Sequence, residues 1–203
     1  MERTWFRIKN KNLIFITLFT LINVVSYIWQ SRYTITLSPL IMLTLAMYIY
    51  QKEFEEFDLS IFKQRSIYEL AGNAFVIAVL LQSGLNLAAK LFFNTEIANM
   101  SMKLFNIPII PVSAVLFAPI LEELIFRKII FGTLDKRCNF WIGSIISSML
   151  FAAAHLSIQL FLGYFAVGMV FCWFYKKSNS LIVTVLAHTY INFLVIISKS
   201  IIT

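Results

Sequence analysis

The sequence has 203 residues, of which 60% are hydrophobic and 13% are charged, with 17 basic and 10 acidic side chains. A water-soluble domain needs a polar exterior, and so few charges do not provide one unless lipid covers most of the chain. The composition therefore excludes an ordinary soluble domain and predicts an all-α fold, a polytopic bundle of transmembrane helices.

The formal net charge of +7 does not by itself indicate a nucleic-acid partner. Membrane proteins gather lysine and arginine on their cytoplasmic face, and this gives the simpler explanation of a basic balance. The two cysteines, Cys138 and Cys172, predict neither a disulfide framework nor a cysteine metal site. We therefore expect the lipid bilayer as a partner and no nucleic acid.

Apolar stretches of membrane-spanning length recur from the amino terminus to the carboxyl terminus. An 18-residue helix rises about 27 Å, which is close to a hydrocarbon core roughly 30 Å thick. We predict about seven helices, with six or eight as alternatives, at residues 12–29, 33–50, 67–93, 108–131, 141–156, 158–175 and 181–198. The first is read as a retained helix, because no small-residue cleavage site follows it.

The basic side chains test this set of spans. With the amino terminus inside, thirteen of the 17 lysines and arginines fall in inner segments and four in outer ones. This asymmetry predicts a multi-pass protein of the cell membrane with a cytoplasmic amino terminus and an extracellular carboxyl terminus.

Residues 51–65 form the one clearly hydrophilic segment. The spacing of Phe54, Phe57 and Phe62 beside a charged face suits an amphipathic helix at the membrane surface, and a solvated connector is the equal alternative. We interpret residues 1–203 as a single integral membrane domain. Its catalytic core is predicted at 66–198, preceded in residues 1–65 by two additional helices and this cytoplasmic loop.

The fourth span carries acidic side chains, which are costly in hydrocarbon and therefore indicate a functional site. Glu122 and Glu123 are adjacent, and Glu123 lies four residues before Arg127, so these two share a helix face and can form an ion pair. That pairing would leave Glu122 free to face another group. A charged helix end is the structural alternative, and it explains the arginine better than it explains two acids.

Both histidines fall inside predicted helices. His155 ends the run Phe151-Ala-Ala-Ala-His155, and His188 lies four residues before Asn192, on the same helix face. Counted from the cytoplasmic helix ends, His155 lies deeper than Glu122 or His188. We therefore expect the fifth helix to be shifted or tilted.

A glutamate, two histidines and an asparagine supply a general base, a second base and donors for a developing oxyanion, which is the inventory of a hydrolase. A zinc ion is conceivable as well, because Glu122, His155 and His188 form a three-ligand set with one open position. The sequence has no HExxH pattern and no Gly-x-Ser-x-Gly elbow, so it supports neither a soluble metalloprotease nor a serine triad.

These motifs resemble the CPBP family of intramembrane proteases, which includes the type II CAAX prenyl endopeptidases and the bacteriocin-processing and immunity proteins. The family's EExxxR, FxxxH and HxxxN patterns read here as residues 122–127, 151–155 and 188–192, in the same order. The resemblance covers about residues 115–193 and leaves the first three helices outside it.

The resemblance implies an endopeptidase whose active site lies within the membrane. Glu122 would activate water with help from His155, while His188 and Asn192 would stabilise the oxyanion. Glu123, Arg127 and Phe151 would support the site structurally. A metal-free mechanism is preferred, and no metal ligand is assigned; a zinc ion, if used, would take the three-ligand set named above.

Three functions remain in competition. The first is hydrolysis of a peptide bond in a membrane-associated peptide or protein, with the cut toward the cytoplasmic side and with leader-bearing signalling peptides or bacteriocin precursors as substrates. The second is a non-catalytic bacteriocin immunity or regulatory protein. The third is a transporter or proton relay, which the absence of an internal repeat counts against.

Overall fold

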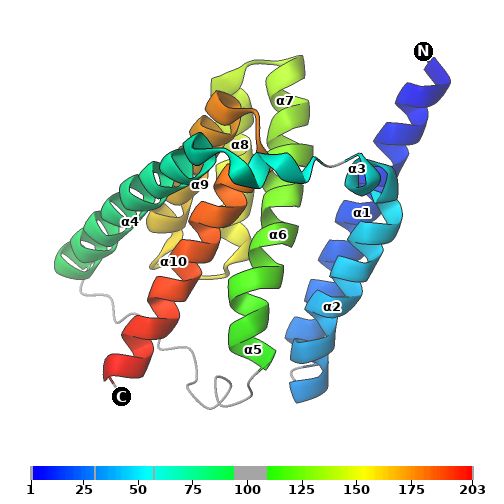
Figure 1. Ribbon diagram of the computed structural model, residues 1–203. Helices are drawn as coiled ribbons and strands as arrows, with labels where there is room; N and C mark the ends of the chain where they lie inside the picture. The colour runs from blue at the N-terminus through cyan, green and yellow to red at the C-terminus, as the bar shows by residue number, and fades with distance from the viewer. Residues whose placement is uncertain (1, 30, 57, 94–108, 203) are drawn as a thin grey trace. The chain divides into compact units, whose positions relative to one another are not determined.

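The computed structural model describes residues 2–29, 31–56, 58–93 and 109–202. These residues contain helices and turns and no strand, so the predicted all-α class is confirmed. Every predicted span has a helical counterpart among them, and Figure 1 shows these helices in chain order. The long helices are α1 (Glu2–Ile28), α2 (Arg32–Ile49), α4 (Arg65–Phe93), α8 (Phe140–Ala154), α9 (Phe161–Ser178) and α10 (Leu181–Ile202).

The fourth predicted span is a continuous helical segment with two π-helical stretches. Its parts are α5 (Ile109–Val112), π-helix η3 (Ser113–Phe117), α6 (Ala118–Glu123), π-helix η4 (Leu124–Phe131) and α7 (Gly132–Arg137). This segment ends six residues beyond the predicted end at residue 131. The hydrophilic segment 51–65 contains two short helical turns, α3 (Gln51–Glu55) and the 3₁₀ turn η1 (Leu59–Lys63), in place of a single surface helix.

By length and apolar composition, two helices within the described residues can cross a membrane: Arg65–Phe92 and Leu181–Ser198. Three shorter apolar helices accompany them, at Lys11–Ser26, Leu37–Ile49 and Phe140–Ala154. Many large apolar side chains on these helices are exposed, among them Leu80 and Leu91. A helical bundle that keeps apolar side chains on its outside is the arrangement that lipid favours.

The chain forms two compact units. The first contains α1, α2, α3, α5, η3 and most of α6, and the second contains α4, η4 and α7 to α10, together with Glu122 and Glu123. All of the site residues predicted from the sequence therefore belong to the second unit.

Polar contacts join the two long helices of the first unit. Lys11 forms an ion pair with Glu53, and the Tyr50 hydroxyl donates a hydrogen bond of 2.9 Å to Oδ1 of Asn12. The buried Tyr50 ring also meets Phe15 edge-on at 5.4 Å between centroids. These contacts hold the end of α2 and the turn α3 against the middle of α1.

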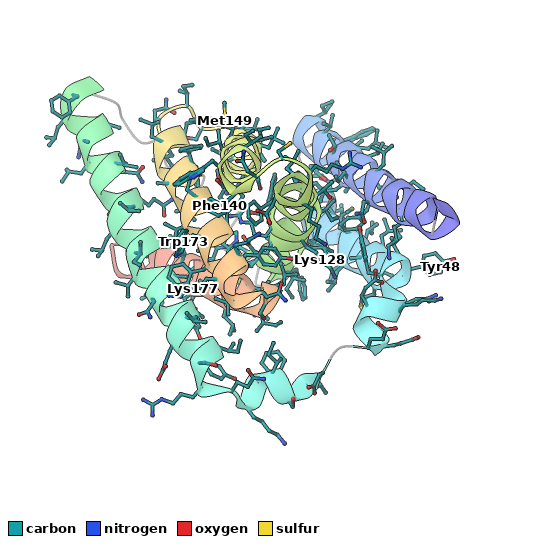
Figure 2. All side chains as sticks on the ribbon, turned by 90° about the horizontal axis from the view of Figure 1, so that it is seen from above. Tyr48, Lys128, Phe140, Met149, Trp173 and Lys177 are labelled. Carbon is teal, nitrogen blue, oxygen red and sulfur yellow. The ribbon has the colours of Figure 1, made fainter. Side chains whose placement is uncertain are left out.

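In the second unit, α9 packs against α4 on one side and α8 on the other, as the view from above in Figure 2 shows. Small residues allow this close approach. A Cβ atom on Gly168 of α9 would lie 2.7 Å from the Cβ of Ser148 on α8, and one on Gly163 would lie 2.5 Å from Oδ1 of Asn86 on α4. Close helix contacts through small residues are typical of membrane bundles.

Candidate active site

The predicted ion pair of the fourth span is present and fully buried. Arg127 Nε lies 3.1 Å from Oε2 of Glu123, and both side chains have no exposed surface. The guanidinium also lies 4.5 Å from the centroid of the Phe151 ring and 5.4 Å from that of Phe171. Since the guanidinium nitrogens make no hydrogen bond within the described residues, charge and ring contacts hold Arg127 in place.

Both glutamates face His188. The sequence predicted His188 as a site residue but not its contact with both carboxylates. Nδ1 of His188 lies 3.0 Å from Oε1 of Glu123, and Nε2 lies 3.9 Å from Oε2 of Glu122. His188 is 5% exposed. The imidazole thus lies between the two carboxylates, with one ring nitrogen directed at each.

The π-helix η4 begins directly after Glu123. A π-helical turn is rare and is found often at functional sites. The hydroxyl of Ser147 on α8 donates a buried hydrogen bond of 2.6 Å to the carbonyl oxygen of Phe126 within this stretch. No residue type in 124–131 marks a π-helix, so nothing in the sequence predicted this link between η4 and α8.

His155 lies at the end of α8 and not inside a helix, which corrects the prediction for this residue. The helix ends at Ala154, His155 is its C-cap, and the next residue, Leu156, has the left-handed φ of 50°. A left-handed leucine is costly and is retained only where its surroundings hold it. Here it turns the chain immediately after the histidine.

The depth of His155 is explained by the length of the fourth span. Glu122 lies fifteen residues before Arg137, where α7 ends, and His155 lies fifteen residues after Phe140, where α8 begins. The two residues are therefore equally far along the chain from the same connection. The difference in depth expected between Glu122 and His155 came from ending the fourth helix too early.

Tyr164 is a site neighbour that the sequence analysis missed. Its ring stacks on His155 with 3.8 Å between centroids and an angle of 26°. Nδ1 of His155 lies 2.8 Å from the carbonyl oxygen of Phe151, so contacts on two sides orient this imidazole. Tyr164 lies in the first turn of α9, and no spacing in the sequence relates it to the three motifs.

The Phe151 ring joins the two histidines. Its centroid lies 4.7 Å from that of His155 and 5.8 Å from that of His188, and its face receives Arg127. The charge of Glu122 also acts electrostatically on His155 and Tyr164. The structure therefore gathers Glu122, Glu123, Arg127, Phe151, His155 and His188 into one cluster.

Two features distinguish Glu122 from Glu123. The Glu122 side chain keeps 24% of its surface exposed, whereas Glu123 is fully buried. Oε2 of each glutamate is buried and makes no hydrogen bond within the described residues, but Oε2 of Glu123 is paired with Arg127 at 3.1 Å. A carboxylate with an unused acceptor and some access from outside can receive a proton from a small molecule such as water.

Asn192 lies on α10, one turn beyond His188, and is half-buried. The spacing of four residues keeps it on the helix face of His188.

The donor groups do not fit the three-ligand zinc alternative. Among the described residues, no three histidine, cysteine, aspartate or glutamate side chains are grouped so that they could hold a metal ion. We therefore derive no catalytic step through a metal.

A family model described as type II CAAX prenyl endopeptidase Rce1-like matches residues 104–194, a little under half of the chain. Over this region the chain resembles an Rce1-like enzyme. The resemblance that the three motifs predict is thereby confirmed, and the matched residues include every residue of the cluster described above.

Three curated relatives each match a little under half of the chain. The putative membrane peptidase YdiL of Bacillus subtilis (strain 168) is 37% identical over 93 residues, which are 46% of this chain and 38% of the relative. The membrane-embedded CAAX protease MroQ of Staphylococcus aureus (strain USA300) is 34% identical over 98 residues, 45% of this chain and 40% of the relative. The UPF0177 protein YxdF of Lactococcus lactis subsp. lactis (strain IL1403) is 33% identical over 102 residues, which are 48% of this chain and 55% of the relative.

This chain spans between 38% and 55% of the length of these relatives. No solved structure gives a significant match. The family description and the names of the first two relatives favour a peptidase and do not favour the non-catalytic immunity alternative.

Proposed function

We propose that this chain is an intramembrane endopeptidase that hydrolyses a peptide bond in a membrane-associated peptide or protein. The observation that carries the proposal is the position of Glu122, a partly exposed carboxylate beside His188 and within electrostatic reach of His155, inside the region that resembles an Rce1-like enzyme. Acids and imidazoles buried in a membrane helix bundle are expensive, and a hydrolytic site accounts for them.

In this proposal Glu122 is the general base. Its partly exposed carboxylate takes a proton from water, whose oxygen then attacks the carbonyl carbon of the substrate. His155, held by the Phe151 carbonyl and by Tyr164, helps to orient that water. General-base catalysis of this kind contributes about 10² to 10⁴ to the rate.

His188 and Asn192 have the role of stabilising the negative charge on the substrate oxygen. Fixed donors in a water-poor site stabilise such a charge more effectively than water does. Glu123 and Arg127 stabilise the helix that carries Glu122, because a fully buried guanidinium requires a counter-charge.

The proposed substrates are leader-bearing signalling peptides or bacteriocin precursors, cut toward the cytoplasmic side of the membrane. This choice is made by analogy with the family, since no contact in the site reads a particular side chain.

The test is cleavage by the purified chain in lipid vesicles, using a panel of membrane-associated precursor peptides in ¹⁸O-labelled water. We expect paired products of the correct summed mass, with the label in the new carboxyl terminus and no loss of rate on adding a chelator. The folded His155→Ala variant should be slower by about 10² or more. Full activity in that variant would refute the assigned site. A cleavage rate that falls on adding a chelator and is restored by zinc would refute the metal-free mechanism.

A further inference from the structure

The two histidines share one feature of hydrogen bonding. In each, Nδ1 contacts a protein oxygen: the Phe151 carbonyl at 2.8 Å from His155, and Oε1 of Glu123 at 3.0 Å from His188. A neutral imidazole has one N–H donor and one bare nitrogen, and the partner of one nitrogen decides which tautomer is present.

A carbonyl oxygen and a carboxylate oxygen can only accept hydrogen bonds. Arg127 keeps its positive charge and lies beside the other oxygen of Glu123, so the buried pair requires Glu123 as a carboxylate. In the neutral form of each ring, Nδ1 is therefore the donor and Nε2 is the bare nitrogen.

We propose that Glu123 is a positioning residue that fixes His188 as the Nδ1-protonated tautomer, so that Nε2 faces Glu122 as a proton acceptor. This inference rests on the proposed peptidase function for its chemical meaning. It gives Glu123 a role beyond its ion pair with Arg127, and it specifies how His188 enters the reaction.

Proton transfer follows from this arrangement. Glu122 takes a proton from water as the water oxygen bonds to the carbonyl carbon and the carbonyl π electrons move onto the oxygen. Nε2 of His188 then receives that proton from Glu122, and Glu123 balances the imidazolium charge. The Nε2–H donates to the oxyanion and passes its proton to the amine nitrogen as the carbon–nitrogen bond breaks.

The distance of 3.9 Å between Nε2 and Oε2 of Glu122 is compatible with this path. It must shorten by about 1 Å to reach hydrogen-bond range, which is a small side-chain rotation. Direct contact at rest is not required, because acid–base pairs often tighten only when substrate is bound.

The direct test is nitrogen NMR of the imidazoles in ¹⁵N-histidine-labelled protein reconstituted in lipid at neutral pH. The chain has only two histidines, so a His155→Gln variant assigns the His188 signals. We expect His188 to show a protonated Nδ1 and a bare Nε2. A protonated Nε2 with a bare Nδ1 would overturn the proposal, whether or not any peptide is cleaved.

A kinetic test separates positioning from fold maintenance. Glu123→Gln keeps an oxygen that can accept from Nδ1 and removes the charge that balances the imidazolium. We expect kcat to fall about 10- to 100-fold while KM changes less than about twofold, because Glu123 does not contact substrate. Glu69→Gln, at an exposed acid of α4, is the matched control and should leave kcat unchanged. An unchanged kcat in folded Glu123→Gln would contradict the proposal, and the NMR result decides the matter if this variant does not fold.

Discussion

At the scale of single residues, the Phe151 side chain determines how the two histidines are placed. Its ring contacts both imidazoles and the Arg127 guanidinium, and its carbonyl oxygen orients His155. Phe151 thus links the Glu123–Arg127 ion pair to both histidines. Its aromatic character, and not only its size, matters at this position.

Tyr164 gives a prediction at this scale. Tyr164→Leu removes the ring that stacks on His155, whereas Tyr164→Phe keeps it. Since an aromatic pair contributes about 0.5–1.5 kcal/mol, the leucine variant should lose about 2- to 10-fold in kcat and the phenylalanine variant should retain the wild-type value. Peptide cleavage by both purified variants checks this, and equal rates in leucine and wild-type protein would contradict it.

The sequence predicted which residues gather in the cluster better than it predicted their contacts. Four-residue spacing on a helix is a local property, so the Glu123–Arg127 pair could be inferred from residues 122–127 alone. The contact of Glu123 with His188 joins residues 65 positions apart, and only the packing of η4 against α10 brings them together.

At the scale of helices, most span ends could be placed within a few residues because an apolar run bounded by polar residues is enough to predict them. The π-helix η4 and the end of α8 at Ala154 could not, since both depend on contacts with neighbouring helices. The hydrogen bond from Ser147 to the Phe126 carbonyl is one such contact. These two irregular features carry Arg127 and His155 in the cluster.

The close contact of α8 with α9 gives a prediction for stability. Gly168→Ala places a methyl group 2.7 Å from the Ser148 Cβ and 2.9 Å from its Cα, so a backbone must move, at a cost of about 1–3 kcal/mol. Gly84→Ala on α4 meets nothing within 4 Å and should be neutral or slightly stabilising. The midpoint of thermal unfolding in detergent is measured for both variants. Equal midpoints would show that the contact between α8 and α9 is looser than described.

At the scale of the whole molecule, the site lies entirely within the second compact unit. Under the proposed function, the orientation of that unit in the membrane decides on which side a substrate is cut. The distribution of lysine and arginine predicts that the connection between α7 and α8 is cytoplasmic. Cys138 is exposed in that connection, whereas Cys172 is buried within α9.

A thiol-labelling experiment uses this pair of cysteines. A membrane-impermeant maleimide should modify Cys138 in inside-out vesicles and leave it unmodified in intact cells, while Cys172 stays protected in both because it is buried. The Cys138→Ser variant is the control and should take up no label. Labelling of Cys138 in intact cells would show that this connection faces the outside and would contradict the predicted orientation.

The central claim is that the Glu122 carboxylate activates the water that cleaves the peptide, and a comparison of two glutamine variants tests it most directly. The value of kcat/KM is measured in lipid vesicles for wild type, Glu122→Gln and the exposed control Glu69→Gln, each verified as folded. The account predicts that kcat/KM falls by a factor of about 10² to 10⁴ in Glu122→Gln and stays close to the wild-type value in Glu69→Gln. A folded Glu122→Gln protein that cleaves peptide at the wild-type rate would contradict it.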